Sequence, residues 1–257
     1  MNINVPLELL NWSLTMLMGS IRIIPTFFLL PFLSSSIVSK TIRMPVMLLI
    51  GGSLWPYPTL ENPIEDLGDF LFIVAREFFI GLVLGIIFAL PFWIMHGIGS
   101  LIDNQRGATI SSTLDPMTGI DTSELANLFN LFAGALFLMG GGLTLLLETV
   151  EASYQVCAPM GTCSPALVPT LGILTQLMIK VIVLASPVVA TLLLTEVLLG
   201  LLSRFAPQLN AFSISLTIKS LIAFFIIILY FSPVLPDAFK ALWVNQSQMN
   251  TWFMNDK

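Results

Sequence analysis

Six long apolar stretches limit what this chain can fold into. An α-helix needs about 20 mostly apolar residues to cross a bilayer. Irregular backbone in contact with lipid would leave polar groups unsatisfied, so only helices or closed barrels span membranes. We therefore predict an all-α integral membrane protein of about six apolar helical segments. They lie near residues 9–33, 41–60, 70–96, 125–147, 173–203 and 212–235.

The composition supports a membrane protein and excludes one class of partner. With 56% hydrophobic and 10% charged residues, the chain lies outside the usual range of soluble proteins. Its 10 Lys and Arg are outnumbered by 15 Asp and Glu, so we expect no basic surface that could hold nucleic acid. The N-terminus lacks the basic region and cleavage site of a signal peptide, so the first stretch should be retained. Residues 1–257 are predicted to form a single membrane domain.

Breaker residues divide the apolar stretches into hairpins. Short joints such as "SSSIVSK" and "FAPQLN" favour antiparallel neighbouring helices. The second stretch is the weakest prediction, because Gly51, Gly52, Pro56 and Pro58 interrupt it. "MGGGL" at 139–143 should bend or end the fourth helix. "GLVLG" at 81–85 has the spacing that lets helix backbones approach closely, either within the chain or between subunits.

The distribution of Lys and Arg predicts the topology and the environment of the cysteines. It favours both termini outside the cytoplasm, with Lys40, Arg43, Arg106 and Arg204 on the cytoplasmic side. The joint holding Cys157 and Cys163 would then face an oxidising periplasm, where a short disulfide loop could form. The alternative is two unlinked cysteines, since spacing does not establish their geometry.

Charged residues within apolar stretches are expensive and need partners. Glu196 and Lys219 lie about equally far from the turn predicted near residue 207, so they should meet across the hairpin. We predict that these two residues and Arg204 form a buried charge clamp. The alternative, a proton or ion relay, usually needs a chain of titratable groups, and His96 is the single histidine. The other candidates are Arg22, Arg76, Glu77 and Lys180.

Motifs of enzymes are missing from the sequence. It has no GxSxG elbow, no HExxH, no P-loop and no His and Cys cluster at metal-ligand spacing. Asp103 and Asp115 are interpreted as loop residues, and "DTSE", from Asp121 to Glu124, as an N-terminal helix cap. We therefore predict no enzymatic activity, no cofactor and no metal site.

One polar segment interrupts the apolar pattern. In "SLIDNQRGATISSTLDPMTGIDTSE", Ser100–Arg106 should end the third helix, and Gly107–Gly119 should be irregular polar chain. Irregular backbone at membrane depth is tolerated where protein buries it or a water-filled cavity surrounds it. Both a pore-lining loop and an ordinary solvated loop outside the membrane satisfy this condition.

Several motifs together resemble the FliR/SpaR/SctT family, the T subunit of the export apparatus in flagellar and virulence type III secretion systems. They include "GSLIDNQRGAT", "SELANLFNLFAGALFLMGGG" and "REFFIGLVLGIIF". "TEVLLGLLSRFAPQLN" is the most specific, because six of its residues match the family pattern in order. These are Glu196, Gly200, Arg204, Pro207, Gln208 and Asn210.

The resemblance implies a structural and gating subunit of a protein-export channel in the bacterial inner membrane. Its expected partners are the R and S subunits, the U and V subunits, unfolded secreted proteins and lipid, in a virulence system rather than a flagellum. It also implies hairpins raised out of the bilayer and partly exposed to the periplasm. The polar loop at about 104–123 would be the plug of the closed channel, with Arg106, Gly107, Ser111, Ser112, Asp115, Pro116, Met117 and Gly119 in it. The alternative is a small-solute or ion transporter with a charged site near the midplane.

Overall fold

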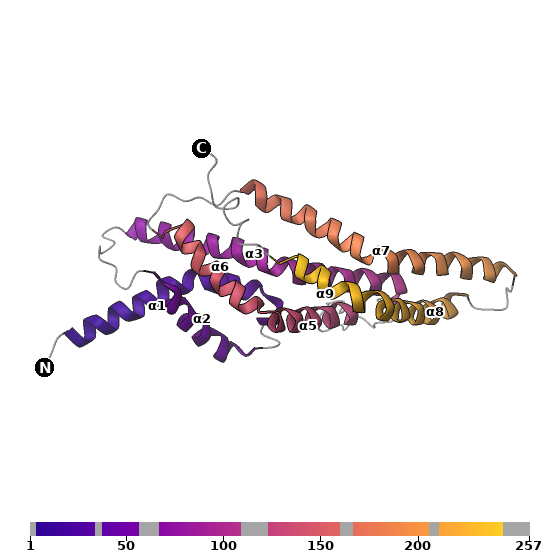
Figure 1. Cartoon of the computed structure of the whole chain (residues 1–257), viewed down its shortest axis with the longest axis horizontal. Helices are drawn as coiled ribbons and strands as arrows, with labels where there is room; N and C mark the ends of the chain where they lie inside the picture. Colours follow the sequence, from indigo (N-terminus) through magenta and orange to yellow (C-terminus); the bar gives the residue numbers. More distant parts are fainter. Residues whose placement is uncertain are drawn as a thin grey trace. The chain divides into compact units, whose positions relative to one another are not determined.

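The described part of the chain is helical, as predicted. The structure is a computed structural model, and it describes residues 4–33, 38–56, 67–108, 123–159, 167–205 and 211–243. It contains no strand in these ranges, which confirms the all-α fold class. In chain order the elements are α1 (Asn4–Leu29), η1 (Pro31–Leu33), α2 (Lys40–Leu54), α3 (Leu67–Arg106), α5 (Glu124–Met139), α6 (Gly142–Val156), α7 (Leu167–Phe205), α8 (Ala211–Ile226), η2 (Ile227–Phe231) and α9 (Ser232–Ala241) (Figure 1).

Four helical stretches of the described residues are long and apolar enough to cross a membrane. They are Trp12–Leu29, Phe70–Arg106, Thr175–Phe205 and Ile214–Ala241, and a bent pair, α5 with α6, makes a fifth if it counts as one span. The second apolar stretch forms only the 15-residue helix α2. It ends at Leu54, directly before Trp55 and Pro56, where the proline restricts the preceding residue to extended backbone.

Glycines break the fourth apolar stretch into two helices. α5 and α6 meet at an angle of 71° across the break between Met139 and Gly142. Gly141 adopts a φ of 78°, a left-handed conformation that glycine accepts without steric penalty. The predicted bend at "MGGGL" is thus confirmed.

The chain divides into two compact units. The first comprises Met1–Leu90, Phe137–Ile173 and Val244–Lys257, and the second comprises Pro91–Leu136 and Leu174–Trp243. In the first unit, α1 and α2 approach so closely that a Cβ added to Gly19 would collide with the backbone of Gly51.

Aromatic packing and a glycine contact hold the second unit together. The ring of Phe92 lies 5.6 Å from that of Phe239, and Phe129 lies 5.4 Å from Phe231. Gly99 of α3 packs directly against the backbone of Ala126 in α5, which leaves no room for a Cβ. These contacts fix the position of α5 against the end of α3. In the sequence, α3 precedes the polar segment and α5 follows it.

The "GLVLG" motif serves packing within the first unit. A side chain at Gly81 would overlap the carbonyl oxygen of Arg22, and one at Gly85 would press on the backbone of Thr26. The hydroxyl of Thr26 donates to the carbonyl of Gly81 over 2.8 Å. Of the two uses expected for the motif, the structure therefore shows close packing of α1 against α3.

Candidate functional site

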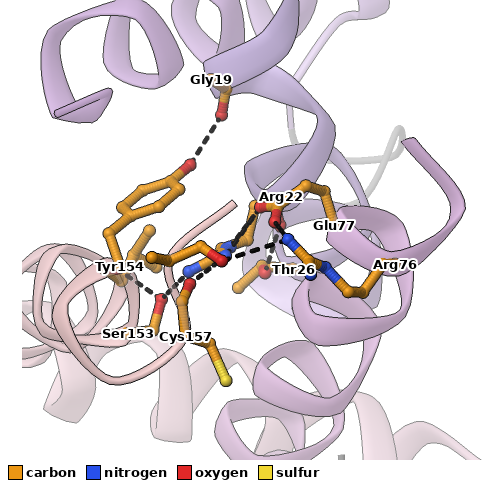
Figure 2. A network of polar contacts seen from close by, with 10 residues as sticks. Gly19, Arg22, Thr26, Arg76, Glu77, Ser153, Tyr154 and Cys157 are labelled. Atoms are coloured by element: carbon orange, nitrogen blue, oxygen red, sulfur yellow. Dashed lines mark hydrogen bonds and ion pairs between the residues drawn. The ribbon is translucent and has the colours of Figure 1, made fainter. Parts of the chain in front are cut away.

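A buried polar network joins α1, α3 and α6 in the first unit (Figure 2). Arg22 lies at its centre with 0% of its surface exposed. Its Nε donates to Glu77 Oε2 over 2.8 Å, and its Nη1 donates to Ser153 Oγ over 2.8 Å. The guanidinium carbon lies 3.9 Å from the ring centroid of Tyr154, whose hydroxyl donates to the carbonyl of Gly19. One arginine thereby binds a carboxylate, a hydroxyl and an aromatic face.

Two arginines also satisfy carbonyl groups at the end of α6. Arg22 Nη2 donates to the carbonyl of Cys157 over 3.0 Å, and Arg76 Nη2 donates to that of Ala158 over 3.1 Å. The last carbonyls of a helix have no partner within the helix and carry partial negative charge, so guanidinium groups suit this position. Arg76 lies 3.7 Å from Glu77 Oε1 as well, which completes an arrangement of two cations around one buried carboxylate.

The network determines which helices pack together. Its charged groups are enclosed by helices. The Nε, Nη1 and Nη2 atoms of Arg22 each donate a hydrogen bond to a protein group. A buried ion pair adds little net stability over apolar packing, but it strongly disfavours arrangements that leave either charge alone. The network therefore specifies how α1, α3 and α6 fit together.

The sequence identified the members of this network only as isolated charges. Arg22 and Glu77 are 55 residues apart, and Arg22 and Ser153 are 131 apart. No local spacing rule joins residues that are so distant. Ser153 and Tyr154 had no signal of their own, because a serine and a tyrosine in an apolar helix are common.

The structure describes only one of the two cysteines that were predicted to form a disulfide. Cys157 is 1% exposed and is disulfide-bonded. Its predicted partner, Cys163, lies outside the described residues, so this pairing remains a prediction. A bond there would tie the end of α6, which Arg22 holds, to the following joint.

In the second unit, Asp103 connects both ends of the polar segment. Its carboxylate is 1% exposed and accepts from Arg106 Nε over 2.7 Å, from Ser123 Oγ over 2.5 Å and from the backbone N–H of Leu125 over 2.9 Å. Ser123 Oγ in turn accepts from the N–H of Ala126. The N-cap of α5 is therefore Ser123, which lies within the predicted cap "DTSE", and Asp103 assists it. Asp103 is a buried residue of α3, so its interpretation as a loop residue was wrong. Ser123 lies next to the first helical residue, where its oxygen can reach the free N–H groups.

Replacing Asp103 with Ala should weaken the start of α5. The substitution removes acceptors from the Ser123 hydroxyl and from the buried N–H of Leu125, and loss of such a cap costs about 1–2 kcal/mol. We expect a lower melting temperature of the detergent-purified chain. Replacing the exposed Asn104 with Ala is the control on the same turn. Equal melting temperatures for the two variants would contradict the role assigned to Asp103.

Most of the predicted plug residues lie outside the described part of the chain. These are Ser111, Ser112, Asp115, Pro116, Met117 and Gly119. α3 ends at Arg106, as expected, and Gly107 follows with a φ of 82° and an N–H bonded to the carbonyl of Asn104. Glycine is favoured at this C-terminal position because of the positive φ. The role of the loop as a plug stays a prediction.

The structure brings two of the three predicted clamp residues together, but the prediction that the clamp is buried was wrong for Glu196 and Arg204, which are exposed. Lys219 Nζ lies 2.9 Å from Glu196 Oε2, with side-chain exposures of 8% and 55%. Arg204 is exposed on α7 and, among the described residues, pairs with neither. His96 contacts Asn130 through Nδ1 over 3.0 Å, and no group of three His, Cys, Asp or Glu in the described ranges could hold a metal ion.

Comparison with known proteins identifies relatives over most of the chain. The family model "Bacterial export proteins, family 1" matches residues 13–245. The surface presentation of antigens protein SpaR of Salmonella typhimurium is 48% identical over 92% of this chain and 90% of its own length. The Yop proteins translocation protein T of Yersinia pestis is 30% identical over 86% of this chain and 87% of its own. The flagellar biosynthetic protein FliR of Bacillus subtilis is 26% identical over 69% of this chain and 71% of its own.

Proposed function

The chain belongs to the family 1 bacterial export proteins as a T subunit of the type III secretion export apparatus, and on this premise we propose a structural and gating role in the export channel. In this role it assembles with the R and S subunits around a pore that conducts unfolded proteins. It also contacts the U and V subunits. The assembly lies in the bacterial inner membrane and is partly exposed to the periplasm.

Exposed apolar surface on the second unit is the observation that carries the proposal. In the described chain, only 22% of the most apolar part of Thr175–Phe205 is buried. The buried share of the most apolar part of Ile214–Ala241 is only 17%. The corresponding value in Phe70–Arg106 is 67%. Large side chains such as Ile182, Leu198 and Phe225 stand out from α7 and α8 with 58–61% exposure. Apolar patches of this extent need a cover of lipid or of other subunits.

The gating part of the proposal rests on the polar segment between α3 and α5. Asp103 and Ser123 lie at its two ends and are joined over 2.5 Å, so the described chain before the segment meets the described chain after it. A segment that is rich in polar residues and whose two ends are held together suits a channel interior that becomes wet on opening. In the proposal this loop is the plug of the closed state.

Purification from membranes in a mild detergent tests the assembly. The chain is expected to be recovered as a stable hetero-oligomer with two other small hydrophobic proteins when the apparatus subunits are produced together. Recovery as an isolated monomer that a small solute stabilises would contradict the proposal, and would instead support the transporter alternative.

Deleting residues 110–120 tests the gate. We expect the complex to assemble and the closed channel to leak small solutes, because the segment proposed to obstruct it is lost while the contacts of Asp103 and Ser123 remain. Solute entry into cells that produce the complex measures the leak. The yield of complex is measured in parallel, and an assembled variant that leaks no more than the wild type would exclude the plug role.

A further inference from the structure

A cavity of about 460 Å³ opens on the first unit, between the end of α2 and one face of α6. Ser53 and Trp55 line it from the end of α2, and Glu151, Tyr154 and Gln155 line it from α6. At about 100° per residue, these three positions of α6 lie within about 100° of one another. The cavity therefore has a polar wall on one helix and an aromatic and polar wall on the other.

The side chains around the cavity suit a cation. Glu151 is exposed, and among the described residues no Lys or Arg forms an ion pair with it. The rings of Trp55 and Tyr154 meet edge to face, with centroids 5.7 Å apart. Aromatic faces attract cations, and a carboxylate accepts strong hydrogen bonds from ammonium groups. Arg22 already lies over the ring of Tyr154, so Trp55 is the ring that a ligand cation would meet.

An exposed apolar stripe on α2 leads to this cavity. Ile42, Val46 and Leu49 are 61%, 39% and 58% exposed. Together with Ser53 they fall within about 60° of the helix circumference, and the row extends over about 16 Å. Ser53 ends the stripe and also lines the cavity. These three apolar residues are called the α2 stripe below.

A ligand that fits both the cavity and the α2 stripe carries an ammonium group and an apolar chain. A phospholipid with an ethanolamine headgroup has both, and a short ethylene link separates its ammonium from its phosphate. Gln155 is exposed one turn beyond Glu151, about 6 Å along α6, and its amide can donate to the phosphate. The hydroxyl of Ser53 already donates to the carbonyl of Ile50 over 2.8 Å, so Gln155 is the better donor.

We propose that this cavity binds the headgroup of an ethanolamine phospholipid. Glu151 and Trp55 hold the ammonium, Gln155 donates to the phosphate, and an acyl chain lies along the α2 stripe. The bound lipid would bridge α2 and α6 and add to the contact between Trp55 and Tyr154. The inference goes beyond the proposed export role and does not depend on it.

Titration of the full chain in detergent tests the headgroup. The dissociation constant for a short-chain phosphatidylethanolamine should be at least about fivefold lower than that for the phosphatidylglycerol with the same chains, which lacks the ammonium. The shift of the melting temperature with lipid concentration gives both constants. Equal affinity for the two lipids would overturn the proposal.

Neutralising the carboxylate tests its assigned role. Glu151→Gln should weaken phosphatidylethanolamine binding at least about fivefold, because the ammonium loses its charged acceptor. Glu148→Gln is the matched control, since Glu148 is also exposed on α6 but does not line the cavity. Both variants should melt like the wild type without lipid. Equal dissociation constants for the two variants would refute the assignment of Glu151.

The source of the ammonium is tested by removing the acyl chains. Phosphoethanolamine should bind at least about tenfold more weakly than the lipid, because it leaves the α2 stripe exposed. Leu49→Ser should weaken lipid binding but not phosphoethanolamine binding. Met44→Ser is the control, because Met44 is exposed on the opposite side of α2. Phosphoethanolamine that binds as tightly as the lipid, or equal effects of the two serine variants, would exclude the lipid as the occupant.

Discussion

Glu77→Gln is expected to lower the stability of the protein by about 3–5 kcal/mol, because it leaves a buried guanidinium without its counter-charge. Arg22 is fully buried, and Glu77 accepts from it at 2.7–2.8 Å. Glutamine has nearly the same shape, so the change isolates the charge. The loss should appear as a strongly reduced amount of protein in the membrane and as a lower melting temperature in detergent.

Two further variants separate charge from packing. Glu148→Gln, on the exposed side of α6, makes the same chemical change away from the network and should melt like the wild type. Arg22→Met combined with Glu77→Leu removes both charges and should recover much of the loss, since apolar residues of similar volume often replace a buried pair without penalty. A Glu77→Gln protein that melts within a degree of Glu148→Gln would refute the role of the network.

Reversing the charge of Glu196 should disrupt assembly. In Glu196→Lys, two ammonium groups would meet where Lys219 Nζ now lies 2.9 Å from a carboxylate. Because the Glu196 side chain is 55% exposed, solvent would screen part of this repulsion in the isolated chain. We expect the hetero-oligomer yield to fall at least about tenfold, which corresponds to about 1.4 kcal/mol.

The reciprocal swap is the control for that reversal. Adding Lys219→Glu to Glu196→Lys re-creates the internal pair and should restore assembly in part. A double variant that assembles no better than Glu196→Lys alone would argue against a direct pair.

The elements that the sequence predicted well are those set by local patterns. Apolar length located the spans, and the glycines of "MGGGL" located the bend between α5 and α6. Counting residues outward from the turn near residue 207 placed Glu196 opposite Lys219, and the structure has them in contact. Such reasoning works within one hairpin, where chain geometry limits the possible partners.

The arrangement around Arg22 could not be predicted in the same way. Its partners come from α3 and α6, and any buried acid in those helices would have satisfied the sequence equally well. The cap of α5 was predicted only in part for a related reason. The segment "DTSE" contains the cap residue Ser123, but the contribution of Asp103 from the preceding helix was not predicted. The contact between Gly99 and Ala126 brings Asp103 to that position, and it depends on tertiary packing.

The network around Arg22 also has a consequence for the order of events during synthesis. Arg22 is made 55 residues before Glu77 and 131 residues before Ser153. At about 5–20 residues per second, its carboxylate partner follows after roughly 3–11 s and its hydroxyl partner after roughly 7–26 s. Throughout that interval α1 holds a guanidinium whose native partners do not yet exist. The nascent chain must therefore keep Arg22 in water or against another protein until α3 and then α6 arrive.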